Sequence, residues 1–277
     1  MLLATTIRLC FLHLSFKMNI LIDRDAHPVI GHRGNRAFAP ENTIESFAQA
    51  VSAGAEAIEF DVHLSADGIA VVHHDPSVQR TTDGRGFIER LTFDQLGKFD
   101  AGANFTLDAG KTYPYRGKGH RIPSLDEVIE AFPSTPLLIE IKTPLAATAV
   151  RTSIEKHKAE ERCLVDSFSK DSLRIFEGTA IAYGAASGEV AQLMREVVFG
   201  SEITPPGVSA LCVPLSYYGL PLPVRRFAEL GPRYDFRVHV WTINSRKVAR
   251  ELWESGVNGI ITDDPARMLN ERAKIGF

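Results

Sequence analysis

Short apolar runs rich in strand-forming residues alternate with helical patterns along almost the whole chain. Eight such runs lie at residues 29–34, 57–65, 137–142, 163–168, 180–185, 210–215, 238–244 and 258–265. Apolar residues at helical spacing follow each run, directly or after a longer excursion. Strands that alternate with helices pair in parallel, because a parallel pairing needs a long crossover connection. The rhythm therefore predicts an α/β chain with a parallel sheet.

Eight strand–helix units in 277 residues favour one closed (β/α)8 barrel, the TIM barrel. An open doubly wound sheet is the alternative, but it usually carries a glycine-rich phosphate-binding turn after its first strand. The first run ends instead in Gly31-His32-Arg33-Gly34, which lacks that pattern. We predict a single barrel domain over residues 28–277. A short inserted segment, at about 76–121, is expected after the second strand region, where Gly, Thr and Asp are frequent.

Residues 1–27 form an N-terminal extension of uncertain status. Arg8 and His13 interrupt its apolar run, which is too short for a transmembrane helix. A signal peptide would also need a small-residue cleavage pattern, and none follows. The three cysteines are widely spaced and odd in number, which favours a reducing compartment. We expect a cytoplasmic protein; a periplasmic or secreted one, with this extension as a signal peptide, is the alternative.

The net charge of the chain limits the classes of partner that are expected. The formal net charge is −3, so we expect neither nucleic acid nor an anionic membrane as a partner, and no stable membrane insertion. A small-molecule substrate is expected instead. The sequence leaves the oligomeric state open.

Charged residues lie inside two strands, near the carboxyl ends where the active sites of TIM barrels are found. Strands of a parallel barrel are buried on both faces, so a charge there is costly unless it is paired or bound to a metal. Glu59 and Asp61 are two residues apart and therefore share one face of their strand. Two carboxylates on a buried face repel each other and favour a cation. We interpret the pair as a metal site, and hard oxygen ligands favour Mg²⁺ or Ca²⁺ over zinc.

Other polar residues also have structural explanations when each is taken alone. A single strand histidine such as His32 is more often a hydrogen-bonded core residue than a catalyst. Glu140 and Lys142 could form an ordinary salt bridge. His73 and His74 are neighbours in a β-segment, so only one of them can face a given site.

The order of several short motifs carries a family resemblance. HRG followed by PENT, then EFD, HHD, EIK and VWT, resembles the glycerophosphodiester phosphodiesterase family. The resemblance runs from about Val29 to Pro265, nearly the whole chain. The stretch RTTDGRGFIERLTFDQLGKFDAG is similar to the inserted segment of bacterial members.

The resemblance implies a TIM barrel that binds one divalent cation. The implied reaction is hydrolysis of glycerophosphodiesters to sn-glycerol 3-phosphate and an alcohol. His32 and His74 would be the general acid/base pair, and the neighbouring glycerol hydroxyl would attack first, giving a cyclic phosphate that water opens. Glu41 of PENT would support the site. The implied metal ligands are Glu59, Asp61 and Glu140. The implied phosphate contacts are Arg33 and Lys142, and the implied substrate-lining rings are those of Trp241 and Phe168.

These residue types suit a phosphodiester, because cationic groups can neutralise the charge that grows on its oxygens. Two alternatives remain. A lysophospholipase D-like barrel acting on lipids would need an apolar rim, for which the loop SYYGLPLPV at 216–224 is the candidate. A non-catalytic barrel that binds phosphate esters would lack one of the histidines or carboxylates, and none is missing.

Overall fold

The computed structural model describes residues 19–217 and 219–277, so most of the N-terminal extension lies outside the described residues. Asn19 and Leu21 belong to the described part and pack against the barrel. The Asn19 amide donates to the carbonyl of Cys163 at 3.2 Å, and the Leu21 carbonyl lies 2.8 Å from His239 Nε2. Leu21 is fully buried. No helix of the described residues is long and apolar enough to cross a membrane.

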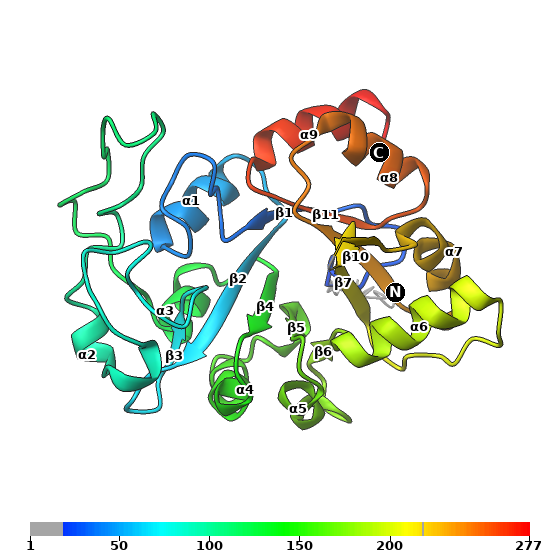
Figure 1. The fold of residues 1–277 in the computed structure, drawn as a ribbon, viewed down its shortest axis with the longest axis horizontal. Helices are drawn as coiled ribbons and strands as arrows, with labels where there is room; N and C mark the ends of the chain where they lie inside the picture. Colours follow the sequence, from blue (N-terminus) through cyan, green and yellow to red (C-terminus); the bar gives the residue numbers. More distant parts are fainter. Residues whose placement is uncertain (1–18, 218) are drawn as a thin grey trace, which may run out of the picture.

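Eight parallel strands form the barrel, as the sequence predicts, and Figure 1 shows them as a ring with the helices outside. The hydrogen-bonded order is β6-β5-β4-β2-β1-β11-β10-β7, and a bridge between Gly184 and Ala210 joins β6 to β7. The strands are β1 (Val29–His32), β2 (Ala57–Leu64), β4 (Leu137–Ile141), β5 (Cys163–Asp166), β6 (Ala182–Tyr183), β7 (Ala210–Pro214), β10 (Arg237–Trp241) and β11 (Gly259–Thr262).

Amphipathic helices cover the outside of the barrel because each has one apolar face to bury. Their packing against the strands makes two large apolar clusters, one around Phe47 and Phe60 and one around Phe227 and Trp253. The helices are α1 (Ile44–Ser52), α3 (Leu125–Ala131), α4 (Ala147–Lys156), α5 (Lys170–Leu173), α6 (Ser187–Phe199), α7 (Val224–Tyr234), α8 (Arg246–Glu254) and α9 (Pro265–Lys274).

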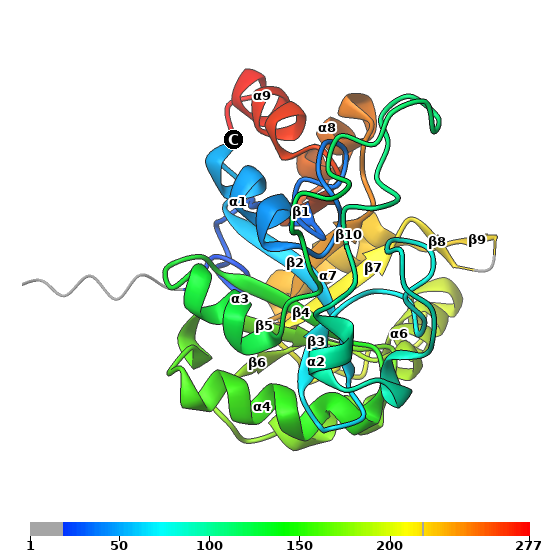
Figure 2. The ribbon, with the colours of Figure 1, turned by 90° about the vertical axis from the view of Figure 1, so that its left-hand side faces the viewer.

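A long excursion separates β2 from α3. It begins with β3 (Ala70–Val72), which pairs antiparallel with β2, and includes the 3₁₀ turn η1 (Ile88–Arg90) and α2 (Phe93–Leu96). A small apolar cluster that includes Val78, Ile88 and Leu96 holds it together. Figure 2 shows this excursion at the same end of the barrel as the hairpin of β8 (Ser216–Tyr217) and β9 (Leu220–Pro221). The stretch at 216–224, expected to be a loop, is therefore partly a two-stranded hairpin that extends from β7.

Inward-facing residues alternate along each barrel strand and form successive layers. The lowest of these is apolar and buried, and it consists of Ile30, Ala57, Leu138, Leu164, Ala182, Ala210 and Ile261, with Leu21 from the segment before β1 packed against them. Because side chains on one face recur every second residue, the next inward position on each strand lies two residues nearer the carboxyl end. At that level β1, β2, β4 and β5 carry His32, Glu59, Glu140 and Asp166. The barrel is thus packed shut below and polar at its mouth.

Candidate active site

His32 ends β1 and is fixed by a partner from the other end of the chain. Its Nδ1 lies 2.7 Å from Oδ1 of Asp263, which follows β11. A carboxylate only accepts, so Nδ1 carries the proton and Nε2 is left for a ligand. Asp263 is held in turn by the Asn244 amide, which donates to Oδ2 at 2.8 Å, and by Arg36 Nη1 at 3.5 Å.

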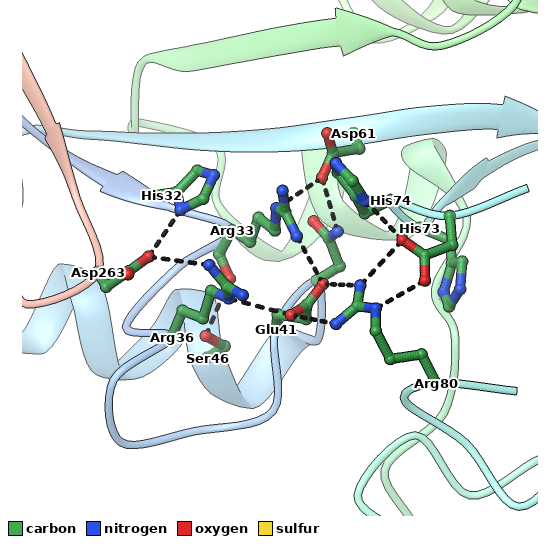
Figure 3. Close-up of polar contacts among 12 residues, drawn as sticks. His32, Arg33, Arg36, Glu41, Ser46, Asp61, His73, His74, Arg80 and Asp263 are labelled. Atoms are coloured by element: carbon green, nitrogen blue, oxygen red, sulfur yellow. Dashed lines mark hydrogen bonds and ion pairs between the residues drawn. The ribbon is translucent and has the colours of Figure 1, made fainter. Parts of the chain in front are cut away.

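His74 repeats this arrangement from the excursion after β3 (Figure 3). Its Nδ1 lies 2.6 Å from Oδ1 of Asp75, and Arg80 Nε donates to the other oxygen of Asp75 at 2.6 Å. Burial lowers the pKa of His74, although Asp61 and Asp75 oppose the effect. Both histidines therefore present Nε2, with Nδ1 held by an aspartate.

His73 has a different environment. Its Nε2 contacts the carbonyl of Ser77 at 3.2 Å, and burial lowers its pKa to about 4. Its ring does not line the cavity that His32 and His74 share. His73 and His74 therefore face different sides, as expected, although β3 ends at Val72 and both residues lie beyond the strand that the expectation assumed.

Arg33 lies in the centre of an ionic network. Its backbone N–H donates to Glu59 at 3.0 Å, and its Nη1 donates to Glu41 at 2.8 Å. Its Nε lies 3.1 Å from Asp61 Oδ2 without hydrogen-bond geometry. Glu41 also accepts from Arg36 at 3.0 Å and from Arg80 at 2.7 Å. Glu41 of PENT therefore accepts hydrogen bonds from three arginines.

The glycines around His32 and Arg33 allow the turn to pack against α1. A Cβ on Gly34, which has a φ of 91°, would lie 2.4 Å from Ser46 Oγ. A Cβ on Gly31 would lie 2.8 Å from the Gly34 carbonyl oxygen. These glycines therefore make room for atoms of α1 and of the turn itself.

Glu59, Asp61 and Glu140 form a compact acidic group, with one oxygen of each within 4.8 Å of the others. Burial, together with the charges of Asp61 and Glu140, raises the pKa of Glu59 well above its ordinary value. Burial also raises the pKa of Glu140. Raised carboxyl pKa values mean that the ionised forms are disfavoured, which an added positive charge would offset. Three oxygen donors in such a place fit a hard divalent cation.

Lys142 and Asn42 complete the surroundings of Asp61. Lys142 Nζ lies 3.2 Å from Asp61 and 2.7 Å from Glu140, and the Asn42 amide donates to Asp61 at 2.9 Å. Burial alone would raise the pKa of Asp61, but the charges of Lys142 and Arg33 outweigh it and lower the pKa. Asp61 thus stays ionised, while Lys142 lies between two of the candidate metal ligands.

A cavity of about 190 Å³ opens between these groups. Of the residues expected to be catalytic, to bind a metal or to contact substrate, all line it except Asp61, whose side chain is only 1% exposed. At the rim the ring of Phe168 meets that of Trp241 edge-on, with centroids 6.2 Å apart. Trp241 is held by a hydrogen bond from Nε1 to the Cys212 carbonyl at 3.1 Å. The expected site residues therefore surround one space at the carboxyl ends of the strands.

Asp263 and Asp166 also belong to the site, although neither was predicted from the sequence. The sequence could have indicated both residues, because each lies near the carboxyl end of a predicted strand, where active-site residues of such barrels are found. Asp166 is 91% buried, and its Oδ1 has no hydrogen-bond partner. Burial and the charge of Glu140 raise the pKa of Asp166 well above its ordinary value.

Comparisons with known proteins agree with this geometry. Residues 32–267 match the glycerophosphoryl diester phosphodiesterase family. A glycerophosphodiester phosphodiesterase of Caldanaerobacter subterraneus is 32% identical over 254 residues, which cover 87% of this chain and 96% of that protein.

Two solved structures are also similar. A phosphodiesterase of Oleispira antarctica, in complex with the product sn-glycerol-3-phosphate, is 27% identical with a TM-score of 0.71, covering 89% of this chain and 96% of that one. A glycerophosphodiester phosphodiesterase of Thermotoga maritima is 27% identical with a TM-score of 0.66, covering 90% and 99%.

Proposed function

This chain belongs to the glycerophosphodiester phosphodiesterase family, and we propose that it hydrolyses glycerophosphodiesters to sn-glycerol 3-phosphate and an alcohol in the cavity between His32 and His74. One observation carries the proposal. Two histidines line one cavity beside a cluster of carboxylates, and an aspartate holds Nδ1 of each at 2.7 Å or 2.6 Å. Such a pair can give and take protons on two sides of a phosphorus atom.

Proton transfer by the two histidines accounts for both halves of the reaction. One Nε2 removes the proton of the glycerol 2-hydroxyl, whose oxygen attacks phosphorus, and the other Nε2 protonates the departing alkoxide. The bond to the alcohol breaks and a cyclic phosphate forms. Water then opens the ring, and the histidines exchange roles. The first attack is intramolecular, which gives it a large proximity advantage.

The carboxylates and cationic residues have separate tasks. Glu59, Asp61 and Glu140 would hold one divalent cation, Mg²⁺ or Ca²⁺. When bound, such a cation stabilises the negative charge on the phosphate oxygens. Arg33 and Lys142 line the cavity and can contact the same oxygens. Hydrogen bonds and ion pairs to Glu41 and Asp61 fix the position of Arg33, so less side-chain entropy is lost when substrate binds.

A coupled assay for sn-glycerol 3-phosphate tests the proposal. We expect release from several glycerophosphodiesters in the presence of a divalent cation, and loss of release in chelator. The panel should include a lysophospholipid, since preferential turnover of a lipid would favour the lipid-cleaving alternative. No release from any diester with Mg²⁺ or Ca²⁺ supplied would overturn the proposal.

We also propose a cytoplasmic location, which rests on the cysteine spacing and on the broken apolar pattern near the N-terminus. Cell fractionation and N-terminal sequencing test it. Cleavage before His27, with the protein outside the inner membrane, would contradict this location.

A further inference from the structure

The carboxylate that holds His74 belongs to the next residue of the chain, Asp75, on the excursion outside the barrel. The Asp75 side chain is 24% exposed, so its carboxylate can turn toward water unless another group holds it. In the described part of the chain, the side chains that donate to Asp75 are those of His74 and Arg80. The orientation of the His74 ring therefore depends on Arg80 as well as on Asp75.

Arg80 grips two carboxylates with one planar group. It donates to both oxygens of Asp75, from Nε at 2.6 Å and from Nη2 at 3.1 Å. The same guanidinium donates to both oxygens of Glu41, from Nη1 at 2.9 Å and from Nη2 at 2.7 Å. Two bidentate pairs on a rigid fork fix the angle of a carboxylate as well as its position. Although burial opposes the shift, hydrogen bonds from Arg80 and His74 lower the pKa of Asp75 to about 2, so Asp75 stays an ionised acceptor.

Glu41 is the fixed end of this connection. It lies in the loop between β1 and α1, and its side chain is only 9% exposed. Its Oε1 accepts from Arg80 and also from Nη1 of Arg33, at 2.8 Å (Figure 3). Arg33 lines the active-site cavity together with His74. Arg80 thus connects the histidine of the excursion to the arginine that we propose contacts phosphate.

Arg80 itself faces a different space. It is not among the residues that line the active-site cavity, and it lines an outer cavity of about 290 Å³ together with Arg36, Glu41 and Asn104. Its side chain is 44% exposed. Arg80 can therefore act on the substrate only through the groups that it holds, and small solutes can reach its position from the outer cavity.

We propose that Arg80 is a positioning residue, which holds Asp75 against His74 so that Nε2 of His74 faces the active-site cavity at a fixed place relative to Arg33. The inference rests on the proposed function, because it assigns a role in proton transfer by His74. The requirement is for the shape of the guanidinium and not for its charge alone. Lysine carries the same charge on a single nitrogen and cannot form two bidentate pairs.

Substitution and chemical rescue test this role. Arg80→Ala should lower kcat for a glycerophosphodiester about ten- to a hundredfold and change KM much less, because the groups that hold the phosphate remain. Guanidinium ion at millimolar concentrations, too dilute to denature, should enter the vacated position and restore part of kcat. Arg80→Lys should stay about tenfold below wild type. The matched control is Arg90→Ala on the same excursion, whose side chain is 75% exposed; it should keep the wild-type kcat and gain nothing from guanidinium.

Nitrogen NMR of protein labelled at histidine gives a readout that needs no turnover. The neutral ring of His74 should carry its proton on Nδ1 in wild type, because Asp75 accepts there. In Arg80→Ala the proton should shift toward Nε2, the nitrogen that carries it preferentially in free imidazole side chains in water. The spectrum of His74→Ala assigns the signal. His32, which Asp263 holds from another part of the chain, should be unchanged and serves as the internal control.

Three results would each overturn the inference: a kcat of folded Arg80→Ala within about threefold of wild type, a kcat of that variant that guanidinium does not raise, or a His74 proton that stays on Nδ1. If Arg80→Ala does not fold, Arg80→Lys decides, since it keeps a positive charge between the two carboxylates; wild-type kcat and KM in that variant would overturn the inference. No turnover by wild type would instead be a failure of the proposed function, and the position of the His74 proton would still decide the role of Arg80.

Discussion

Replacing Asp263 with asparagine should slow turnover about ten- to a hundredfold and leave the fold intact. In the structure, one oxygen of Asp263 accepts from His32 at 2.7 Å and the other accepts from Asn244 at 2.8 Å. Asparagine has one acceptor oxygen and no charge, so it can satisfy only one of these donors. The other donor then faces an amide N–H.

The size of the effect follows from the bond that is lost. A hydrogen bond to a charged group contributes about 1.5–3 kcal/mol, and about 1.4 kcal/mol corresponds to a tenfold change in rate. The interaction is not strongly screened by water, because the side chains of His32 and Asp263 are only 9% and 20% exposed. Since the bond orients an imidazole that we propose exchanges protons with the substrate, we expect the loss to appear in kcat more than in KM.

The assay is steady-state release of sn-glycerol 3-phosphate, with a built-in control at the next residue. Asp264 caps α9 by accepting from the Arg267 N–H at 3.1 Å, and asparagine is an equally good cap. Asp264→Asn should therefore keep both kcat and the melting temperature. If Asp263 acts only through His32, Asp263→Asn combined with His32→Ala should be no slower than His32→Ala alone. A kcat of Asp263→Asn within about twofold of wild type, or fully additive losses, would refute the reasoning.

Three other predictions concern the carboxylates and the histidines. Chelation should abolish turnover and added Mg²⁺ or Ca²⁺ should restore it, and full turnover after exhaustive chelation would exclude the metal role. In chelator, Glu59→Gln should raise the melting temperature by about 3 °C at about pH 8. The folded state raises the pKa of Glu59, so this carboxyl destabilises the fold progressively as pH rises above its unfolded pKa. An equal rise in the melting temperature of Glu59→Gln at about pH 4 would contradict that cause. His32→Ala and His74→Ala should each lower kcat by about a hundredfold or more, with the double variant little worse than either, whereas folded His73→Ala should keep most of its activity. The reverse pattern for His73 and His74 would show that the acid/base pair is wrongly assigned.

The sequence by itself indicated several of the residues that face the mouth of the barrel. The eight strand–helix units predict parallel strands, and a side-chain period of two along a strand is a local property of the backbone. That period is enough to place Glu59 and Asp61 on one face. The position of active sites at the carboxyl ends of barrel strands then indicates His32 and Glu140 as well.

Only the tertiary structure decided which of these groups meet and how they are charged. His32 and Asp263 are 231 residues apart, and they touch because β1 pairs with β11. His74 reaches the same cavity from an excursion outside the barrel, whose path depends on its own small apolar cluster. Asp166 lies against the glycine of a neighbouring strand and lines the active-site cavity, which no local pattern specifies. Hydrogen bonding, burial and charge at such a site depend on distances across the barrel, and closure of the sheet sets those distances.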